Sequence, residues 1–492
     1  MSASARSRRI AVISSSVFTV VLLATFFFAT QQNSVQKAEE LLRRAMLLSA
    51  QGDTVETEKI ARQAIELDGS LSAAHRLAAD CAVARNDFEQ ALSDLSQISN
   101  SNTDDWVSSR RLAAEILHNR VFKFSKAEQA YQNVLAAVPD DFFANNGYAR
   151  LLGLCGRRRE AIPCVLRLIR AGEETDLLIL LSRESGALND PDMLNSARQA
   201  DPSDPNPLLG QAAIAASALK PQLALNKLNQ AALLKGLPKD FHGRLGRQLF
   251  DNGRFDELTE WSRNLTIETM TAECWIVQAE LAERSNDHRG AIRCYWEAVK
   301  LQPESLKATN QLARKLTVDG QQDLATSIAE RVQLLNKFRD LQRIVIMSDE
   351  QSSDTDIAEM VKAYRSVGRL WEAYAWGKLA LENQPQNTAL RQVVKSLPDS
   401  ILQLPLAMTV PESNPANQID LSHYPIPSFH SDSHSKLVAA SSDNISFRQQ
   451  RSEIGFDFQY FNGTEDTTGR MFEFGGCGIA VIDFDNDEAS DL

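Results

Sequence analysis

Apolar side chains recur every three or four residues along the chain between residues 37 and 397. That spacing places them on one face of a helix, so the pattern predicts amphipathic helices of roughly 12 to 16 residues. Gly, Asn, Asp or Pro separates successive runs, and these residues end helices and form turns. We therefore expect residues 37–397 to fold as a succession of short helices.

The predicted helices repeat with a fixed period. Ala291 is followed by Ala325, and Ala127 by Ala161, in both cases after 34 residues. The clearest unit is 272–305, which carries small and large side chains at fixed offsets: Trp275, Ala279, Ala282, Ala291, Tyr295, Ala298 and Pro303. The turn between the two helices of a unit is predicted at Gly156, Gly253, Gly320 and Gly368. Because a single unit leaves one apolar face uncovered, neighbouring units must stack.

This pattern resembles the tetratricopeptide repeat family. The resemblance implies an all-α fold, a tetratricopeptide-like α-solenoid over 37–397, whose first helices line a concave face that holds a peptide or a partner domain. Carried over to this sequence, it places these side chains on that face: Arg76, Asp80, Asn146, Arg150, Glu273, Glu280 and Glu283. Their charges are mixed, so no simple ligand charge is predicted, and each one alone is equally consistent with solvated surface. The stretches 171–222 and 336–356 match the repeat poorly.

The amino-terminal segment is apolar along its whole length. Residues 10–30 carry no charge and follow a basic tail, residues 1–9. At about 1.5 Å per residue, such a helix matches a hydrocarbon core of roughly 30 Å. The positive-inside rule places the tail in the cytoplasm and exports the bulk of the chain to the periplasm or the exterior. We expect a transmembrane signal anchor; a cleaved secretory signal is the alternative, disfavoured because Phe27 spoils the small-residue cleavage pattern before Ala29.

The net charge and the positions of the cysteines bear on two questions: whether the chain binds nucleic acid and whether it forms disulfide bonds. The formal net charge is -12, and no basic stripe lies outside the first ten residues, which argues against a nucleic-acid partner. Arg157, Arg158 and Arg159 form a run at a predicted turn, and we interpret them as solvated. The cysteines show no CxxC pair, so buried free thiols are predicted; bridges within the pairs Cys155 and Cys164 or Cys274 and Cys294 are the alternative.

Beyond the repeats the composition changes twice. Residues 398–436 are rich in Pro, Ser and Asn without helical periodicity, which predicts an extended, semi-rigid linker. Residues 437–492 alternate Phe, Tyr, Ile and Val, which is typical of strands, and end in an acidic loop. Carboxylates at the first, third, fifth and ninth loop positions have the spacing that Ca²⁺ requires. The predicted metal ligands are Asp483, Asp485, Asp487 and Asp491, with plain solvated acids as the alternative.

The carboxyl-terminal segment resembles the opening of propeller domains with FG-GAP or VCBS repeats that precede an ASPIC/UnbV module. The resemblance lies in a Gly-Phe-x-Phe strand, Asn462-Gly463, and Gly475-Gly476 ahead of the aspartate loop. It implies calcium as the only cofactor. Glu488 stands where that family has Gly, and a non-Gly residue in a left-handed turn costs about 1 to 2 kcal/mol. A propeller needs at least about four blades, so we expect a truncated member or a segment completed by another chain.

The acidic loop also fits two classes of enzyme. Asp483-x-Asp485 after a strand also occurs in metal-dependent glycosyltransferases and in aspartate-nucleophile phosphatases, but each needs an α/β domain that the helical repeats do not provide. The sequence has no P-loop, GxSxG, HExxH or dinucleotide-binding turn, so no enzyme is predicted. We expect a membrane-anchored exported scaffold that binds partner proteins through the solenoid. The alternative is a fragment of a calcium-dependent surface adhesion or assembly protein.

Overall fold

The computed structural model describes residues 33–99, 103–172, 188–347, 354–395 and 403–428, together with Leu177 and Leu181. All of them belong to one compact unit, Met1–Ser433. The predicted anchor at 10–30, the strand-like segment 437–492 and its calcium ligands lie outside these ranges. Within the described ranges, no helix has both the length and the apolar character needed to cross a membrane.

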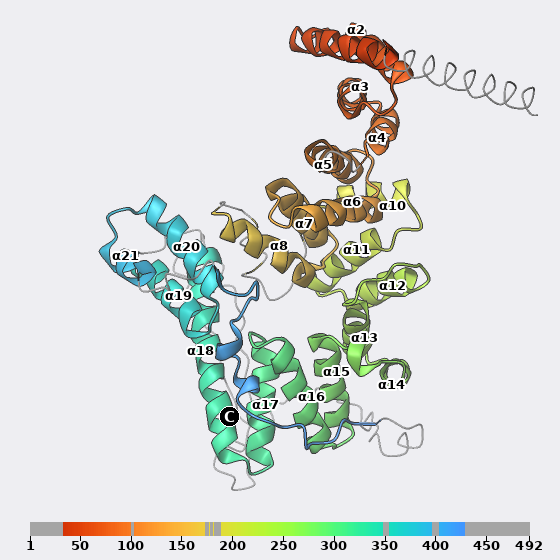
Figure 1. Cartoon of the computed structure of the whole chain (residues 1–492). Coiled ribbons are helices and arrows are strands. Elements are labelled where there is room, and N and C mark those ends of the chain that lie inside the picture. Colours follow the sequence, from red (N-terminus) through yellow and green to blue (C-terminus); the bar gives the residue numbers. More distant parts are fainter. Residues whose placement is uncertain are drawn as a thin grey trace, which may run out of the picture. The chain divides into compact units, whose positions relative to one another are not determined.

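The helices follow one another as antiparallel pairs (Figure 1). We call the first helix of a pair A and the second B. The first pair joins helix 33–50 to α2 (Thr54–Leu67). The next pairs are α3 (Ser72–Ala84) with α4 (Phe88–Ser96), α5 (Thr103–Asn119) with α6 (Phe124–Ala137), α7 (Phe142–Leu154) with α8 (Arg158–Arg170), and α11 (Asn206–Ser217) with α12 (Pro221–Ala232). The last are α13 (Phe241–Asp251) with α14 (Phe255–Arg263), α15 (Ala272–Arg284) with α16 (His288–Leu301), α17 (Leu306–Val318) with α18 (Gln322–Met347), and α19 (Asp354–Ser366) with α20 (Leu370–Asn383).

The predicted all-α architecture is confirmed for the described part of 37–397. B helices contact the A helix that follows them, as α2 does α3, α6 does α7 and α16 does α17, and A helices of neighbouring pairs also touch, as α5 does α7 and α13 does α15. The alanines of the predicted unit are fully buried where its two helices cross: Ala279, Ala282, Ala291 and Ala298. Tyr295, also fully buried, fills the space beside them. Small residues let the helices approach, and large ones fill the remaining volume, as the repeat requires.

Every A–B turn contains one residue in the left-handed region of φ and ψ. The predicted turn glycines have φ of 68° at Gly156, 67° at Gly253, 79° at Gly320 and 74° at Gly368. The other turns use Gly52, Asn86, Phe122, Leu219 and Asn286 in the same way. The residue that follows donates its N–H to a carbonyl five residues back, as Arg157 does to Leu152 at 2.8 Å, except after Phe122, where Lys123 donates to Leu117, six residues back. The five-residue hydrogen bond defines the Schellman ending of a helix, so the same backbone geometry closes every described hairpin except α5–α6.

Two stretches that match the repeat poorly still fold as helices. In the first, α10 (Pro191–Ala200) packs against α11, and most residues between α8 and α10 lie outside the described ranges. In the second, α18 continues without a break to Met347, so it is much longer than the other B helices. A short final helix, α21 (Thr388–Lys395), covers α19 and α20.

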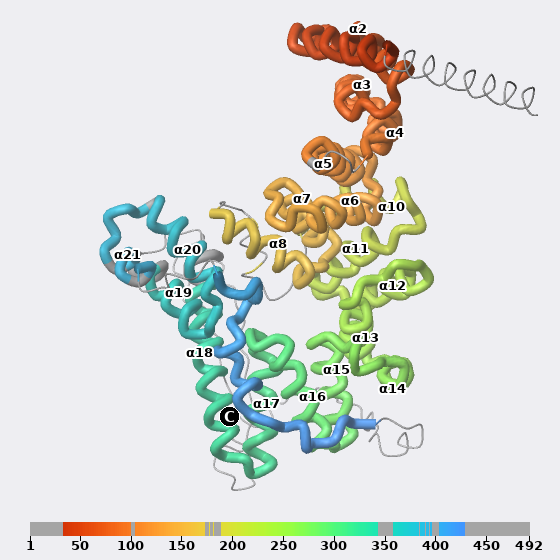
Figure 2. The backbone as a smooth tube through the Cα atoms, in the orientation of Figure 1, coloured from red at the N-terminus to blue at the C-terminus, as the bar shows by residue number. Residues whose placement is uncertain are grey.

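Residues 403–428, part of the predicted linker, pack onto the helices (Figure 2). They form no α-helix but include two 3-10 turns, η3 (Pro411–Ser413) and η4 (Pro415–Asn417). Leu421 and Tyr424 of this segment are almost completely buried. Hydrogen bonds fix it, among them Trp371 Nε1 to the Pro405 oxygen (2.8 Å), Val410 N to the Gly368 oxygen (2.9 Å) and Trp296 Nε1 to the Ala416 oxygen (3.1 Å). In this range the segment is therefore a packed part of the array and not a free spacer.

The cysteines of the helical pairs behave as predicted. Cys81, Cys155, Cys164, Cys274 and Cys294 are all buried and carry free thiols. The alternative of a bridge between Cys155 and Cys164, or between Cys274 and Cys294, is therefore not what the structure shows. Burial raises the pKa of these thiols, most strongly at Cys155 and Cys294, so they stay protonated and fill space in the core.

Leu219 tests the need for a left-handed residue at each turn. It has φ of 55°, and 88% of its surface is exposed, so its side chain gains little from packing. Asn tolerates this conformation, whereas leucine pays about 1 to 2 kcal/mol for it. We predict that Leu219→Asn raises the midpoint of denaturant-induced unfolding, measured by circular dichroism, by the equivalent of about 1 kcal/mol.

The matched control for this change is Leu233→Asn. Leu233 is 86% exposed, but its φ is -80°, a conformation that leucine adopts without strain. We expect no stabilisation there. Equal gains at the two positions would show that losing an exposed leucine, and not relief of backbone strain, raises the stability.

Candidate functional site

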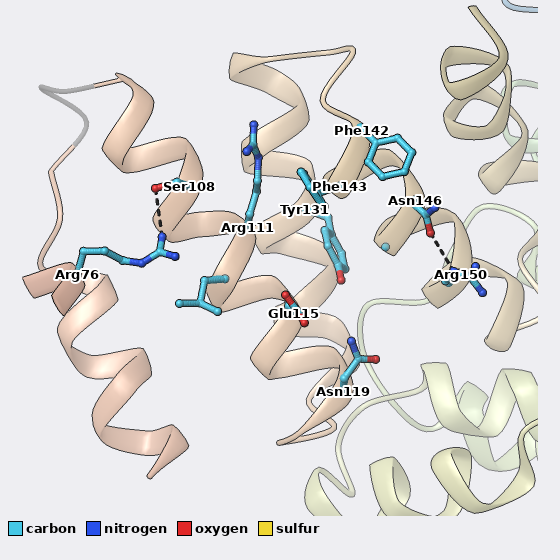
Figure 3. Close-up of a pocket in the computed structure, with 12 residues that line it drawn as sticks. Arg76, Ser108, Arg111, Glu115, Asn119, Tyr131, Phe142, Phe143, Asn146 and Arg150 are labelled. Atoms are coloured by element: carbon cyan, nitrogen blue, oxygen red, sulfur yellow. Dashed lines mark hydrogen bonds between the residues drawn. The ribbon is translucent and has the colours of Figure 1, made fainter. Parts of the chain in front are cut away.

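Three successive A helices line a pocket of about 460 Å³, which we call the arginine pocket (Figure 3). Each helix contributes one guanidinium group: Arg76 from α3, Arg111 from α5 and Arg150 from α7. Glu115 is the sole carboxylate among the residues that line it in the described structure. The A helices stand side by side, so residues of the same face from three different repeats meet in one place.

Local hydrogen bonds hold the three arginines in position. Arg76 donates from Nε to Asp80 (3.0 Å) and from Nη1 to the Ser108 hydroxyl (3.1 Å), which bridges α3 to α5. Arg111 forms an ion pair with the buried Asp141, the residue that caps the start of α7. Arg150 donates from Nε to Asn146 Oδ1 at 2.8 Å. These contacts fix the orientation of the three guanidinium groups.

Aromatic side chains form the apolar part of the pocket. Phe143 is 65% exposed, and the guanidinium of Arg111 lies 5.6 Å from the centre of its ring. Tyr131 of α6 also lines the pocket, and its hydroxyl is 3.3 Å from Nδ1 of the buried His118. Burial, and secondarily the charge of Arg150, lowers the pKa of His118 to about 4, so this ring is neutral near pH 7. The pocket thus joins an exposed aromatic ring to several cations.

The predicted groove residues fall into two groups. Arg76, Asn146 and Arg150 line the arginine pocket, with Asp80 held beside them by Arg76. Glu273, Glu280 and Glu283 come from α15, far along the chain. The structure therefore brings together the first group alone, and the two groups do not form one site.

The three glutamates of α15 make ion pairs with neighbouring A helices. Arg247 of α13 lies 2.6 Å from Glu273 and 2.7 Å from Glu280. Glu280 also pairs with Lys307 of α17, and Glu283 lies 3.3 Å from Lys315 of the same helix. These carboxylates thus connect three consecutive A helices and are already occupied by basic partners.

The interpretation of residues 157–159 as a solvated turn is wrong for the first two. Arg157 and Arg158 are both only 6% exposed. Arg157 lies 2.6 Å from Glu128 of α6 and 2.7 Å from Glu160 of α8, and it donates to Asn206 Oδ1 at 3.1 Å. Its charge is buried because three repeats meet around it, and the carboxylates compensate for the lost hydration.

A second buried arginine occupies the corresponding turn of a distant repeat. Arg369 follows Gly368 as Arg157 follows Gly156, and it pairs with Glu372 at 2.5 Å. Arg158 and Arg369 each donate from Nη2 to the carbonyl oxygen of Leu181 at 2.7 Å. These two hydrogen bonds join α8 to α20. The sequence signal for this arrangement is Gly-Arg-x-x-Glu, which occurs within the helical repeats at 156–160, 253–257 and 368–372.

The described helices therefore form a tetratricopeptide-like array. No family model matches this chain, and neither does any curated protein. Among solved structures, it is similar to a chain of the APC/C hetero-tetramer Cut9–Hcn1, with 14% identity over 73% of this chain and 89% of that chain, at a TM-score of 0.31. It is also similar to the P58(IPK) TPR domain, with 15% identity over 73% and 97%, at a TM-score of 0.24.

A third solved structure of similar kind is the human IFIT1 dimer with PPP-AAAA. The identity is 13% over 71% of this chain and 87% of that chain, and the TM-score is 0.29. At TM-scores this low, the likenesses carry no weight. The assignment rests on the helix pairs, their common turn and their buried small residues.

Arg157 and Arg254 give a matched test of the buried charge. Both follow a turn glycine and both pair with a glutamate three residues later, but the side chain of Arg157 is 7% exposed and that of Arg254 is 51% exposed. We predict that Arg157→Gln lowers the free energy of unfolding by about 3 kcal/mol, because Glu128 and Glu160 lose their counter-charge.

Arg254→Gln should change the free energy of unfolding by no more than about 0.5 kcal/mol, since exposed ion pairs contribute little. Both values come from urea denaturation followed by circular dichroism. Similar losses in the two variants would contradict the assignment of Arg157 as the buried tie between repeats.

Proposed function

We propose that this chain is a scaffold that binds an extended segment of a partner protein along its A helices. The observation that carries the proposal is the arginine pocket, in which three repeats place one guanidinium group each beside the exposed ring of Phe143. A large exposed aromatic side chain flanked by fixed polar groups is typical of an interaction site.

The chemistry of the pocket indicates which segment it would hold. Guanidinium groups bind carboxylates in a planar, two-point geometry, and the side chains of Arg76 and Arg111 are each 34% exposed. Phe143 offers apolar surface to an aliphatic or aromatic side chain of the same segment. Asn119 and Asn146 carry both donors and acceptors and can meet a peptide backbone. The proposed ligand is therefore a peptide segment with an acidic side chain near an apolar one.

The setting of the scaffold is a further part of the proposal. We infer from the sequence that residues 10–30 anchor the chain in a membrane, with residues 1–9 in the cytoplasm and the helical array exported. The scaffold would then hold its partner close to the membrane surface. Binding without catalysis is what the array supports best. Calcium ligation by Asp483, Asp485, Asp487 and Asp491 stays a prediction from the sequence.

The test compares what the full chain captures when the pocket is altered. We predict that the double variant Arg76→Ala, Phe143→Ala recovers its partner at least about tenfold less than the wild type, measured by quantitative mass spectrometry after affinity capture. Arg111 is left in place because its loss would leave the buried carboxylate of Asp141 without a counter-charge. Both chosen side chains are partly or largely exposed, so their removal should leave the fold intact.

The matched control alters one cation and one exposed apolar residue on B helices or their ends. Lys126 of α6 is exposed, and Leu233 follows α12 with 86% of its surface exposed. The double variant Lys126→Ala, Leu233→Ala should capture the same proteins as the wild type. Equal recovery by the pocket variant and the wild type would rule out the arginine pocket as the contact site.

A further inference from the structure

A second pocket lies among α8, α11, α13 and α15 and has a volume of about 600 Å³. It shares no residue with the arginine pocket, and nothing in the proposed scaffold role requires it. Its size falls within the range of small-molecule sites, which is about 300 to 1,000 Å³. We call it the alanine pocket, after the residues of α11 that form its apolar floor: Ala212, Ala213 and Ala216.

The carboxylates that line the alanine pocket are already engaged or buried. Glu160 pairs with Arg157 at 2.7 Å, and Glu273 pairs with Arg247 at 2.6 Å. Asp251 lies 3.6 Å from Arg247 as well. Burial raises the pKa of the remaining one, Asp240, which weakens its tendency to carry charge. Little negative charge is therefore left to neutralise a further cation.

Two cations of the alanine pocket have no carboxylate within ion-pair distance among the described residues. Arg244 donates from Nη1 to the Cys155 oxygen (3.2 Å) and from Nη2 to the Leu209 oxygen (2.6 Å), both neutral carbonyl groups. Lys239 is exposed at the start of the same segment. A charged guanidinium held by carbonyl oxygens alone keeps its full positive charge, and a partly buried site strengthens its pull on an anion.

The residues around Arg244 leave room for its guanidinium group in the wall of the alanine pocket. Gly156 has φ of 68°, and a Cβ at this position would lie 2.5 Å from the Ala213 methyl group and 3.1 Å from Arg244 Nη2. Only glycine leaves room for the guanidinium beside the turn. Gln248, also in the wall, is 7% exposed, and its Oε1 has no hydrogen-bond partner. An N–H donor on a ligand would satisfy that oxygen.

We propose that the alanine pocket binds a small organic anion, with Arg244 and Lys239 facing its acidic group and the alanine floor holding its apolar body. An amide N–H on the same molecule would meet Gln248. The proposal concerns a small molecule and is separate from the peptide site at the arginine pocket. An N-acylated apolar amino acid has all three features and serves as the probe.

The experiment titrates N-acetyl-leucinate into the full chain in a non-ionic detergent, followed by isothermal calorimetry. N-acetyl-leucinamide is the matched uncharged probe, because it keeps the apolar body and the amide. We expect one molecule of the acid per chain, bound at least about fivefold more tightly than the amide. Arg244→Gln and Lys239→Gln should each bring the acid towards the affinity of the amide and leave the binding of the amide unchanged.

Two controls locate the effect. Arg254→Gln removes an exposed cation from the same helix pair, and Arg76→Ala alters the arginine pocket; neither should change binding of the acid. Lys239 is exposed, so its variant remains informative even where loss of Arg244 disturbs the fold. The proposal is overturned by equal affinities for acid and amide, by unchanged binding in both pocket variants, or by loss of binding in the Arg76 variant.

Discussion

One backbone constraint underlies the whole array, namely the left-handed residue that closes each A–B turn. At every described turn except that of Phe122, it ends the A helix with a Schellman hydrogen bond and reverses the chain into the B helix. Repetition of one turn geometry makes successive pairs alike, so A helices fall next to A helices. Both pockets exist because of this adjacency, since neither could be formed from a single pair.

Charges at the interfaces between pairs determine what each part of the A-helix surface can bind. On α13, α15 and α17, basic side chains pair with the glutamates of α15, which ties these helices together. On α3, α5 and α7, arginines outnumber carboxylates in the pocket. Ion pairs between A helices thus serve cohesion, whereas the cations proposed to bind ligands line the two pockets.

The parts of the fold that depend on local rules could be predicted from the sequence. The alanines of 272–305 and the turn glycines mark helix crossings and left-handed positions, which are decided by a few neighbouring residues. Arg157 could not be predicted in this way. The same Gly-Arg-x-x-Glu sequence gives a buried arginine at 157 and at 369 but an exposed one at 254, because burial depends on which other helices arrive there.

The candidate sites also contain some features that local sequence rules predict and others that depend on contacts between repeats. The sequence placed Arg76, Asn146 and Arg150 on the A-helix face, and they do line one pocket. It could not show that Glu273 and Glu280 are paired, since Arg247 comes from another repeat. Nor could composition show that residues 403–428 pack against the helices, because Pro-rich segments form spacers and packed loops alike. Contacts between repeats decide these outcomes.

The central claim is that neighbouring A helices stand side by side and present one continuous surface. A double-mutant cycle on Arg247 of α13 and Glu280 of α15, whose charged groups lie 2.7 Å apart, tests it most directly. The stabilities of Arg247→Gln, Glu280→Gln and the double variant would be measured by urea denaturation. The account predicts a coupling free energy of about 1 kcal/mol or more; effects that add to within about 0.3 kcal/mol would contradict it.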